Sequence, residues 1–327
     1  MRHFIRRTGF FLVTLWAALT INFLLPRLMP GNPAVAMMAR FHGHLNGGAI
    51  RAMEIAFGVN TKASLLSQYF TYLGNCFTGH WGISLTFFPS SVSSVVLAAL
   101  PWTIALVGVT TVLAFVLGTL IGIIGAWNRG KLFDSVLPPI FIVLSAFPYF
   151  FLGLMAILLF SVKLGWFPTS GAYTNGVTPA FNWSYISDVL QHAVLPGLTI
   201  LVTSIGGWIL TMRNNMIGTL SEDYIRMARA KGLSSRLVMF NYAARNAILP
   251  NLTGFGMSLG FVVSGAILVE YVFAYPGVGY MLLQAVVNED YPLMQTLFLF
   301  VTVAVLLAVL IADGVVSLLD PRARSTK

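Results

Sequence analysis

Residues 99–127 read ALPWTIALVGVTTVLAFVLGTLIGIIGAW and contain no charged side chain. A helix needs about 20 predominantly apolar residues to cross the hydrocarbon core of a bilayer. This stretch is therefore long enough for one crossing. The uncharged run extends back to Val92, but residues 92–127 are too few for two crossings and the turn between them. We expect one long or tilted transmembrane helix here.

The rest of the chain has the same character. Of its 327 residues, 57% are hydrophobic and 9% are charged, whereas soluble domains are about 45–50% apolar. Too few charged side chains remain to coat a soluble fold of this length. Because the windows are continuously apolar and do not alternate, they predict an all-α membrane protein with a six-helix transmembrane bundle. The five further windows lie at about 9–29, 135–162, 192–213, 248–273 and 293–318.

The first apolar window follows the basic sequence MRHFIRR, so it also has features of a secretory signal. Its apolar core is longer than that of a typical signal peptide, and no small-x-small cleavage site follows it. We expect this segment to be retained as the first transmembrane helix.

The distribution of basic residues indicates the topology. The chain has a formal net charge of +9, and fourteen of its 19 Lys and Arg residues fall in segments predicted to lie on the inner side. Inner loops of membrane proteins are enriched in Lys and Arg, so this skew places both termini in the cytoplasm. The positive charge then reflects topology, and we expect no nucleic-acid partner. The five basic residues predicted on the outer side are Arg27, Arg40, Arg51, Lys62 and Lys163.

Two predicted loops are long. Residues 30–98 form an extracytoplasmic loop with room for small helices, and residues 218–247 form a charged cytoplasmic loop. The outer loop contains Cys76, the only cysteine, so no internal disulfide or thiolate metal cluster can form. It also contains His42 and His44, but no third ligand accompanies them, and we expect no metal site.

Residues 125–132, GAWNRGKL, follow part of the pattern of a phosphate-binding loop. Leu132 stands where that motif needs Ser or Thr to hold magnesium, and the segment follows an apolar helix instead of a strand. The chain also lacks the sequence motifs of serine hydrolases and zinc proteases. We therefore expect neither nucleotide binding nor catalysis by this chain.

The predicted cytoplasmic loop contains EDYIRMARAKG, residues 222–232, with five charged side chains in eleven positions. Ser221 is placed to cap a helix, acidic residues follow in its first turn, and Gly232 supplies a stop. Ser234 or Ser235 is placed to cap a second helix that runs toward the fifth apolar window. The pattern predicts an elbow of two short helices joined at a glycine.

Small and charged side chains alternate along the first helix of this elbow. Glu222 and Arg226 have the i,i+4 spacing of a favourable ion pair. Ala228 and Ala230 leave a low-relief face, which a groove in another protein accepts closely. The alternative is a solvated loop helix without a partner. The cations flanking the low-relief face are Arg226, Arg229 and Lys231.

The sequence YIRMARAKGL, followed by YAARNAILP, resembles the coupling loop, often called the EAA loop, of binding-protein-dependent ABC importer permeases. The form is that of the oligopeptide and dipeptide branch. Arg226 and Met227 stand where the general family has Glu and Ala, whereas Ala228 and Gly232 match it.

Further matches to this branch cover nearly the whole chain in order. Asn32 replaces an aspartate in the first of them, the second and third resemble motifs of the branch, and the last three are close to its pattern. They are LMPGNP (28–33), GHWGIS (79–84), PYFFLG (148–153), EYVFAYPGVG (270–279), DYP (290–292) and LLDPR (318–322).

The resemblance implies a type I ABC importer permease of the first-permease (B-type) branch in a bacterial inner (plasma) membrane. Such a permease works with a second homologous permease subunit, two ATPase subunits that bind ATP and Mg, and an extracytoplasmic solute-binding protein. It carries no cofactor itself, is surrounded by lipid and passes a peptide substrate, although members of the family also carry nickel complexes and other solutes. The coupling residues implied on this chain are Glu222, Asp223, Tyr224, Arg226, Ala228, Arg229, Ala230, Lys231 and Gly232, and the implied outer gate region is Glu270, Pro276, Gly277 and Gly279.

The rival interpretation is a stand-alone channel or an ion-coupled secondary transporter. Such a protein usually places an acidic or basic residue near the bilayer midplane. Glu270 and Asp313 instead lie near the ends of apolar windows, where a structural role is as reasonable as a functional one. The nearly uncharged middle of the windows favours the ABC permease.

Overall fold

The computed structural model describes residues 2–28, 64–264 and 266–319. Within these ranges the chain is helical and has no β-strand. Several predicted features fall outside these ranges. Outside the described residues lie His42, His44, residues 29–33 of the LMPGNP motif and residues 320–322 of the LLDPR motif.

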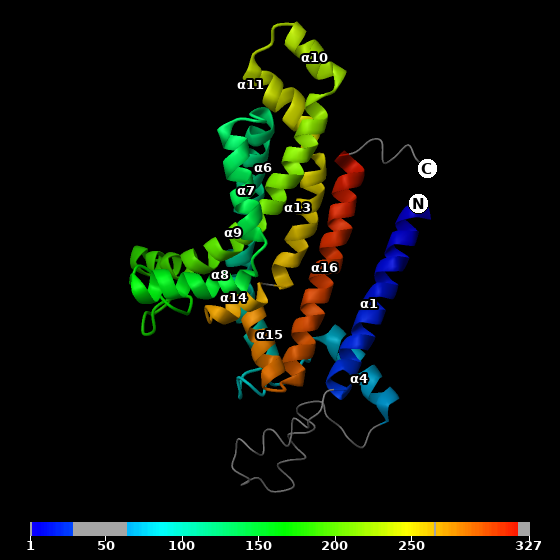
Figure 1. The fold of residues 1–327 in the computed structure, drawn as a ribbon. Coiled ribbons are helices and arrows are strands. Elements are labelled where there is room, and N and C mark those ends of the chain that lie inside the picture. Colours follow the sequence, from blue (N-terminus) through cyan, green and yellow to red (C-terminus); the bar gives the residue numbers. More distant parts are fainter. Residues whose placement is uncertain (1, 29–63, 265, 320–327) are drawn as a thin grey trace. The chain divides into compact units, whose positions relative to one another are not determined.

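Figure 1 shows the helices in chain order. The first half contains α1 (Arg2–Leu28), α4 (Leu65–Thr78), α5 (Val92–Thr103), the π-helical η1 (Ile104–Gly108), α6 (Val109–Trp127), α7 (Leu132–Ser145), α8 (Tyr149–Ala156) and the π-helical η2 (Ile157–Lys163). The second half contains α9 (Trp183–Leu220), α10 (Asp223–Ala230), α11 (Ser235–Leu237), the π-helical η3 (Val238–Ala244), α12 (Arg245–Ala247), α13 (Leu249–Phe261), η4 (Val262–Ser264), α14 (Ile267–Val272), α15 (Val278–Val287) and α16 (Tyr291–Leu319).

Five helical stretches of the described chain are long and apolar enough to cross a membrane, or six if α7 and α8–η2 together form one span. The predicted helix over 92–127 is confirmed as one continuous helical stretch that includes η1. The window at 192–213 covers only the middle of α9, which has 38 residues and is about 57 Å long at about 1.5 Å per residue. That length exceeds the hydrocarbon core of a bilayer, about 30 Å thick.

The predicted window 135–162 is not a single straight helix. The axes of α7 and α8–η2 differ by 99°. Pro148 occupies the position before the first residue of α8. Because proline has no N–H and disfavours helical backbone at the residue before it, the helix ends at this point. Pro138 and Pro139 lie inside α7 without ending it.

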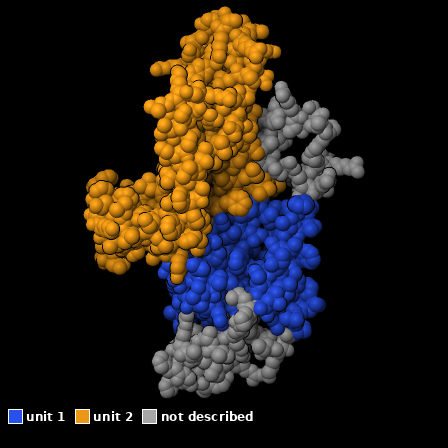
Figure 2. Space-filling view, in the orientation of Figure 1, with its two compact units in different colours: residues 1–103, 263–267, 276–307 blue, residues 104–262, 268–275, 308–327 orange. Residues whose placement is uncertain are grey.

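The chain divides into two compact units, coloured separately in Figure 2. Unit 1 comprises residues 1–103, 263–267 and 276–307, and unit 2 comprises residues 104–262, 268–275 and 308–327. Each unit has a hydrophobic core of its own, and each is described by itself.

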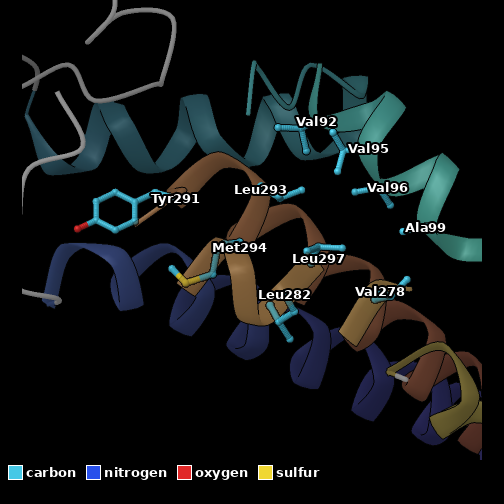
Figure 3. Close-up of a cluster of buried hydrophobic side chains, with 11 residues drawn as sticks. Val92, Val95, Val96, Ala99, Val278, Leu282, Tyr291, Leu293, Met294 and Leu297 are labelled. Carbon is cyan, nitrogen blue, oxygen red and sulfur yellow. The ribbon is translucent and has the colours of Figure 1, made fainter. Parts of the chain in front are cut away.

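The core of unit 1 is formed by α5, α15 and α16, as Figure 3 shows. Its α5 side chains follow the i, i+3, i+4 spacing of a helix face buried against neighbours. Aliphatic side chains dominate the cluster, so the three helices are held by close packing. The buried residues are Val92, Val95, Val96, Ala99, Val278, Leu282, Ala285, Tyr291, Leu293, Met294 and Leu297.

Polar contacts in unit 1 join α1 to α4 and α16. The amide of Asn22 donates to the Tyr72 hydroxyl at 2.9 Å and to the Gln295 carbonyl oxygen at 2.7 Å. Interhelical hydrogen bonds of this kind hold membrane helices in register. Nearby, burial raises the pKa of the Cys76 thiol, which disfavours the reactive thiolate form.

In unit 2, glycines bring α9 close to α6 and α7. A Cβ atom at Gly118 would lie 2.6 Å from the Trp208 Cβ, and one at Gly122 would lie 2.8 Å from the Met212 Cβ. The close approach predicted from the Gly118–Gly122 spacing is therefore confirmed. Gly206 plays the same part toward α7, since its Cβ would lie 2.8 Å from the Phe141 carbonyl oxygen.

Two adjacent glycines of α9 provide a matched test of this packing. We expect Gly206→Ala to lower the free energy of unfolding by about 1–3 kcal/mol, because the added methyl group overlaps α7. Gly207 has no neighbouring atom within 4 Å of a Cβ, so Gly207→Ala is expected to be neutral or to stabilise the helix by about 1 kcal/mol. Thermal unfolding in detergent measures both, and equal midpoints for the two variants would contradict the packing described.

Candidate functional site

The predicted elbow is present and lies beyond the Leu220 end of α9 (Figure 1). The prediction that Ser221 caps the first helix of the elbow is wrong, however, because Ser221 terminates α9. Its N–H and its hydroxyl both donate to the Gly218 carbonyl oxygen, at 3.2 Å and 2.6 Å. Glu222 has the extended backbone of an N-cap residue instead, although its side chain makes no capping hydrogen bond. Only two residues therefore separate α9 from α10.

Gly232 ends the first arm of the elbow, as predicted. Its φ of +76° places it in the left-handed region that favours glycine, and its N–H donates to the Arg229 carbonyl oxygen at 3.0 Å. The second arm then runs through α11, η3 and α12. Ser234 stands at its N-cap position without a side-chain capping bond.

The ion pair of α10 differs from the predicted one. Arg226 pairs with Asp223, with its Nη1 3.6 Å from the Asp223 Oδ1, and not with Glu222. Glu222 lies outside the helix as its N-cap, so the i,i+4 geometry does not apply. Both members of the observed pair are exposed, and such a pair contributes little stability.

One side of α10 is buried against the rest of unit 2. Ile225 is 0% exposed and Ala228 is 3% exposed. They pack in a cluster that includes Met212 and Met216 of α9 and Val238 of η3. The expectation that Ala228 lies on an exposed low-relief face is therefore wrong. Ile225 and Ala228 are three positions apart and therefore share a helix face. When the isoleucine side chain is buried, the alanine on the same face is buried as well.

The opposite side of α10 is exposed and mixes apolar and cationic side chains. Met227 is 59% exposed, and Tyr224 beside it accepts a hydrogen bond from the Asn246 amide at 3.1 Å. The Arg229 guanidinium lies 5.2 Å from the centre of the Trp127 ring, within cation–π range. We call this surface the exposed face of α10. It consists of Tyr224, Arg226, Met227, Arg229 and Ala230.

The four predicted outer-gate residues fall in two units. Glu270, on α14 of unit 2, is 0% exposed, and its carbonyl oxygen accepts from the Tyr275 N–H at 2.7 Å. Burial, and then the nearby Glu270 carboxyl, raise the pKa of Tyr275 to about 12, so its hydroxyl ionises less readily than that of an exposed tyrosine. Pro276, Gly277 and Gly279 belong to unit 1, where Gly277 is the N-cap of α15. That these residues form one gate stays a prediction.

Sequence reasoning missed a polar site in unit 1 that joins two of the quoted motifs. Asp290, which is fully buried, accepts from the Ser84 hydroxyl at 2.5 Å and from the Thr86 N–H at 2.9 Å through Oδ2. Its Oδ1 accepts from the Leu293 N–H at 3.2 Å and so caps α16. An aspartate just before a helix with an early proline is an N-cap signal that the sequence did contain. Its partner Ser84, however, is 206 residues away.

We expect Asp290→Ala to lower the free energy of unfolding by about 2 kcal/mol, because it removes a helix cap and the acceptor of the buried Ser84 O–H group. Thr86→Ala is the control, since Thr86 donates to Asp290 through its main chain. Thermal unfolding in detergent compares the two variants. A destabilisation by Thr86→Ala as large as that by Asp290→Ala would contradict the assigned role.

Comparison with known proteins shows to which family the chain is similar. Residues 118–325 match the family described as the binding-protein-dependent transport system inner membrane component. The chain is 34% identical to the di/tripeptide transport system permease protein DppB of Pseudomonas aeruginosa (strain UCBPP-PA14), over 98% of this chain and 97% of the relative. It is 32% identical to the oligopeptide transport system permease protein AppB of Bacillus subtilis (strain 168), over 98% of both chains.

A third relative, the dipeptide transport system permease protein DppB of Lactococcus lactis subsp. cremoris (strain MG1363), is 28% identical over 99% of both chains. The family match covers more than half of the chain, and the relatives align along its whole length. The apolar helices, the elbow and these similarities lead to one conclusion: the chain is an integral membrane protein that belongs to the binding-protein-dependent transport system inner membrane component family.

Proposed function

We propose that this chain is the first (B-type) permease subunit of an ATP-driven importer of peptides and forms half of its translocation pathway. The relatives named as dipeptide, di/tripeptide and oligopeptide permeases support peptide cargo. In this proposal the chain is a single permease domain in a bacterial inner membrane with six spans, of which α7 and α8–η2 form the third. Both termini and the loop 218–247 are cytoplasmic, and the loop 30–98 is extracytoplasmic.

The observation that carries the proposal is the construction of the elbow. Its buried side fixes α10 to α9 through Ile225 and Ala228. Its exposed face presents a large apolar side chain, Met227, among cations. Met and Arg are both enriched at protein interfaces, so this combination supports a partner that covers the exposed face of α10. A partner that grips α10 would therefore also move α9.

The partners proposed are a second homologous permease, two ATPase subunits and an extracytoplasmic solute-binding protein. The ATPases bind ATP and Mg and carry out hydrolysis, so this chain is a non-catalytic transport subunit without a cofactor. Closure of the ATPase pair displaces the elbow and shifts the bundle between inward-open and outward-open states.

Reconstitution in proteoliposomes tests this function. The assembled permeases, ATPases and binding protein are expected to accumulate labelled peptide only with ATP and Mg, and omission of the ATPases is expected to abolish uptake. Peptide transport by the purified chain alone, or driven by an ion gradient without ATP, would overturn the proposal in favour of a channel or a secondary transporter.

A further inference from the structure

An ion pair inside unit 2 joins α7 to α9. The Arg213 Nε lies 2.6 Å from the Asp134 Oδ1, and the Arg213 Nη2 donates to the Asp134 Oδ2 at 2.8 Å. The Gly130 N–H, in the turn between α6 and α7, also donates to Oδ2 at 3.2 Å. Asp134 is 7% exposed. The buried carboxylate therefore has three donors, which come from the α6–α7 turn and from α9.

Such a pair is weak evidence for stability, because taking two charges out of water costs about as much as their attraction returns. What it does supply is geometry. The planar guanidinium group donates two parallel hydrogen bonds to a carboxylate in one orientation. A bidentate pair therefore fixes both the distance between the two helices and their rotation relative to each other. A role in orientation therefore explains this pair better than a role in stability.

The position of Arg213 connects it to the elbow. Its sequence neighbour Met212 packs in the cluster that holds Ile225 and Ala228 of α10. Only Ser221 and Glu222 separate α9 from α10. Displacement of α10 is therefore transmitted to this end of α9. There the Arg213 guanidinium forms the ion pair that joins α9 to α7.

Glycine contacts also pack α9 closely against α6 and α7. Gly122 meets the backbone of α9 at Ile209 and Arg213, and Gly206 meets α7 at Phe141. The ion pair is thus added to a close-packed seam at the end nearest the elbow. Without it, packing alone would set the rotation of α9 at that end.

We infer that Asp134 and Arg213 are positioning residues, which hold the elbow end of α9 against the α6–α7 turn so that displacement of α10 reaches α7. This inference rests on the proposed function. Neither residue contacts cargo or nucleotide in this role. The pair converts movement of the elbow into movement of the helices behind it.

The test measures peptide taken up per ATP hydrolysed by the complete importer in proteoliposomes. We expect Asp134→Asn to lower this ratio about fivefold while ATP hydrolysis continues. Arg213→Lys is expected to give an intermediate ratio, because an ammonium group cannot form the bidentate pair. The exchange Asp134→Arg with Arg213→Asp is expected to recover most of the wild-type ratio.

Asp188→Asn is the matched control. Asp188 lies on the same α9 helix, and its carboxylate accepts two hydrogen bonds from Thr174, both at 2.7 Å. Its replacement is expected to leave the ratio unchanged. An unchanged ratio for Asp134→Asn would overturn the positioning role. Equal losses of uptake, hydrolysis and assembled complex, with no recovery in the exchange, would also overturn it and show a structural role only. Failure of the wild-type importer to take up peptide with ATP would instead overturn the proposed function.

Discussion

Replacement of Ala228 by glutamate is expected to detach the first arm of the elbow from unit 2. Ala228 is 3% exposed and packs with Met212 and Met216, so the new carboxylate would be buried without a partner. Burial of an unpaired charge costs about 3–5 kcal/mol. A helix as short as α10 is not stable by itself and depends on its packing. We expect both uptake and peptide-stimulated ATP hydrolysis to be lost. Limited proteolysis is expected to cut the chain within residues 221–235.

Ala230→Glu is the control for this result. It makes the same chemical change two residues away, at an exposed position of the same helix. The elbow is expected to keep its resistance to proteolysis in this variant. Proteolysis of both variants at the same rate, or of neither, would show that α10 is not held by the side that contains Ala228.

Replacement of Met227 by glutamate is expected to break the contact between the importer and its ATPases while the elbow stays folded. Met227 is 59% exposed and contributes little to the packing of its own chain. As the apolar anchor of an interface it would contribute about 2 kcal/mol or more to binding. Its loss would then weaken ATPase binding by about thirtyfold at 25 °C. Co-purification with the ATPases and the peptide-to-ATP ratio measure the effect.

Met227→Leu tests whether apolar contact is the cause. Leucine keeps the apolar character and nearly the volume of methionine, so it is expected to retain most of the binding. Normal ATPase binding by Met227→Glu, with an elbow that still resists proteolysis, would show that the exposed face of α10 is not the contact surface.

Local sequence patterns were enough to predict where the long helices lie, where α10 ends and where two helices approach closely. The apolar windows located the long apolar helices because a bilayer demands about 20 apolar residues whatever the neighbours are, although the window 135–162 proved to be two helices. Gly232 marked the end of α10, since the backbone there needs a positive φ that glycine adopts without strain. Gly118 and Gly122 marked a close helix contact because small residues at that spacing let two backbones approach. Each of these signals lies within one short segment.

Tertiary structure decided which surfaces are hidden and which distant residues meet. The apolar side chains of α10 lie on both sides of this eight-residue helix, with Ile225 buried and Met227 exposed, so only the fold showed that Ala228 is buried. The pairs Asp290 with Ser84 and Asp134 with Arg213 join segments far apart in the chain. No local pattern encodes such partners, because a hydrogen bond depends on where the folded backbone brings each group, and packing between helices sets that position.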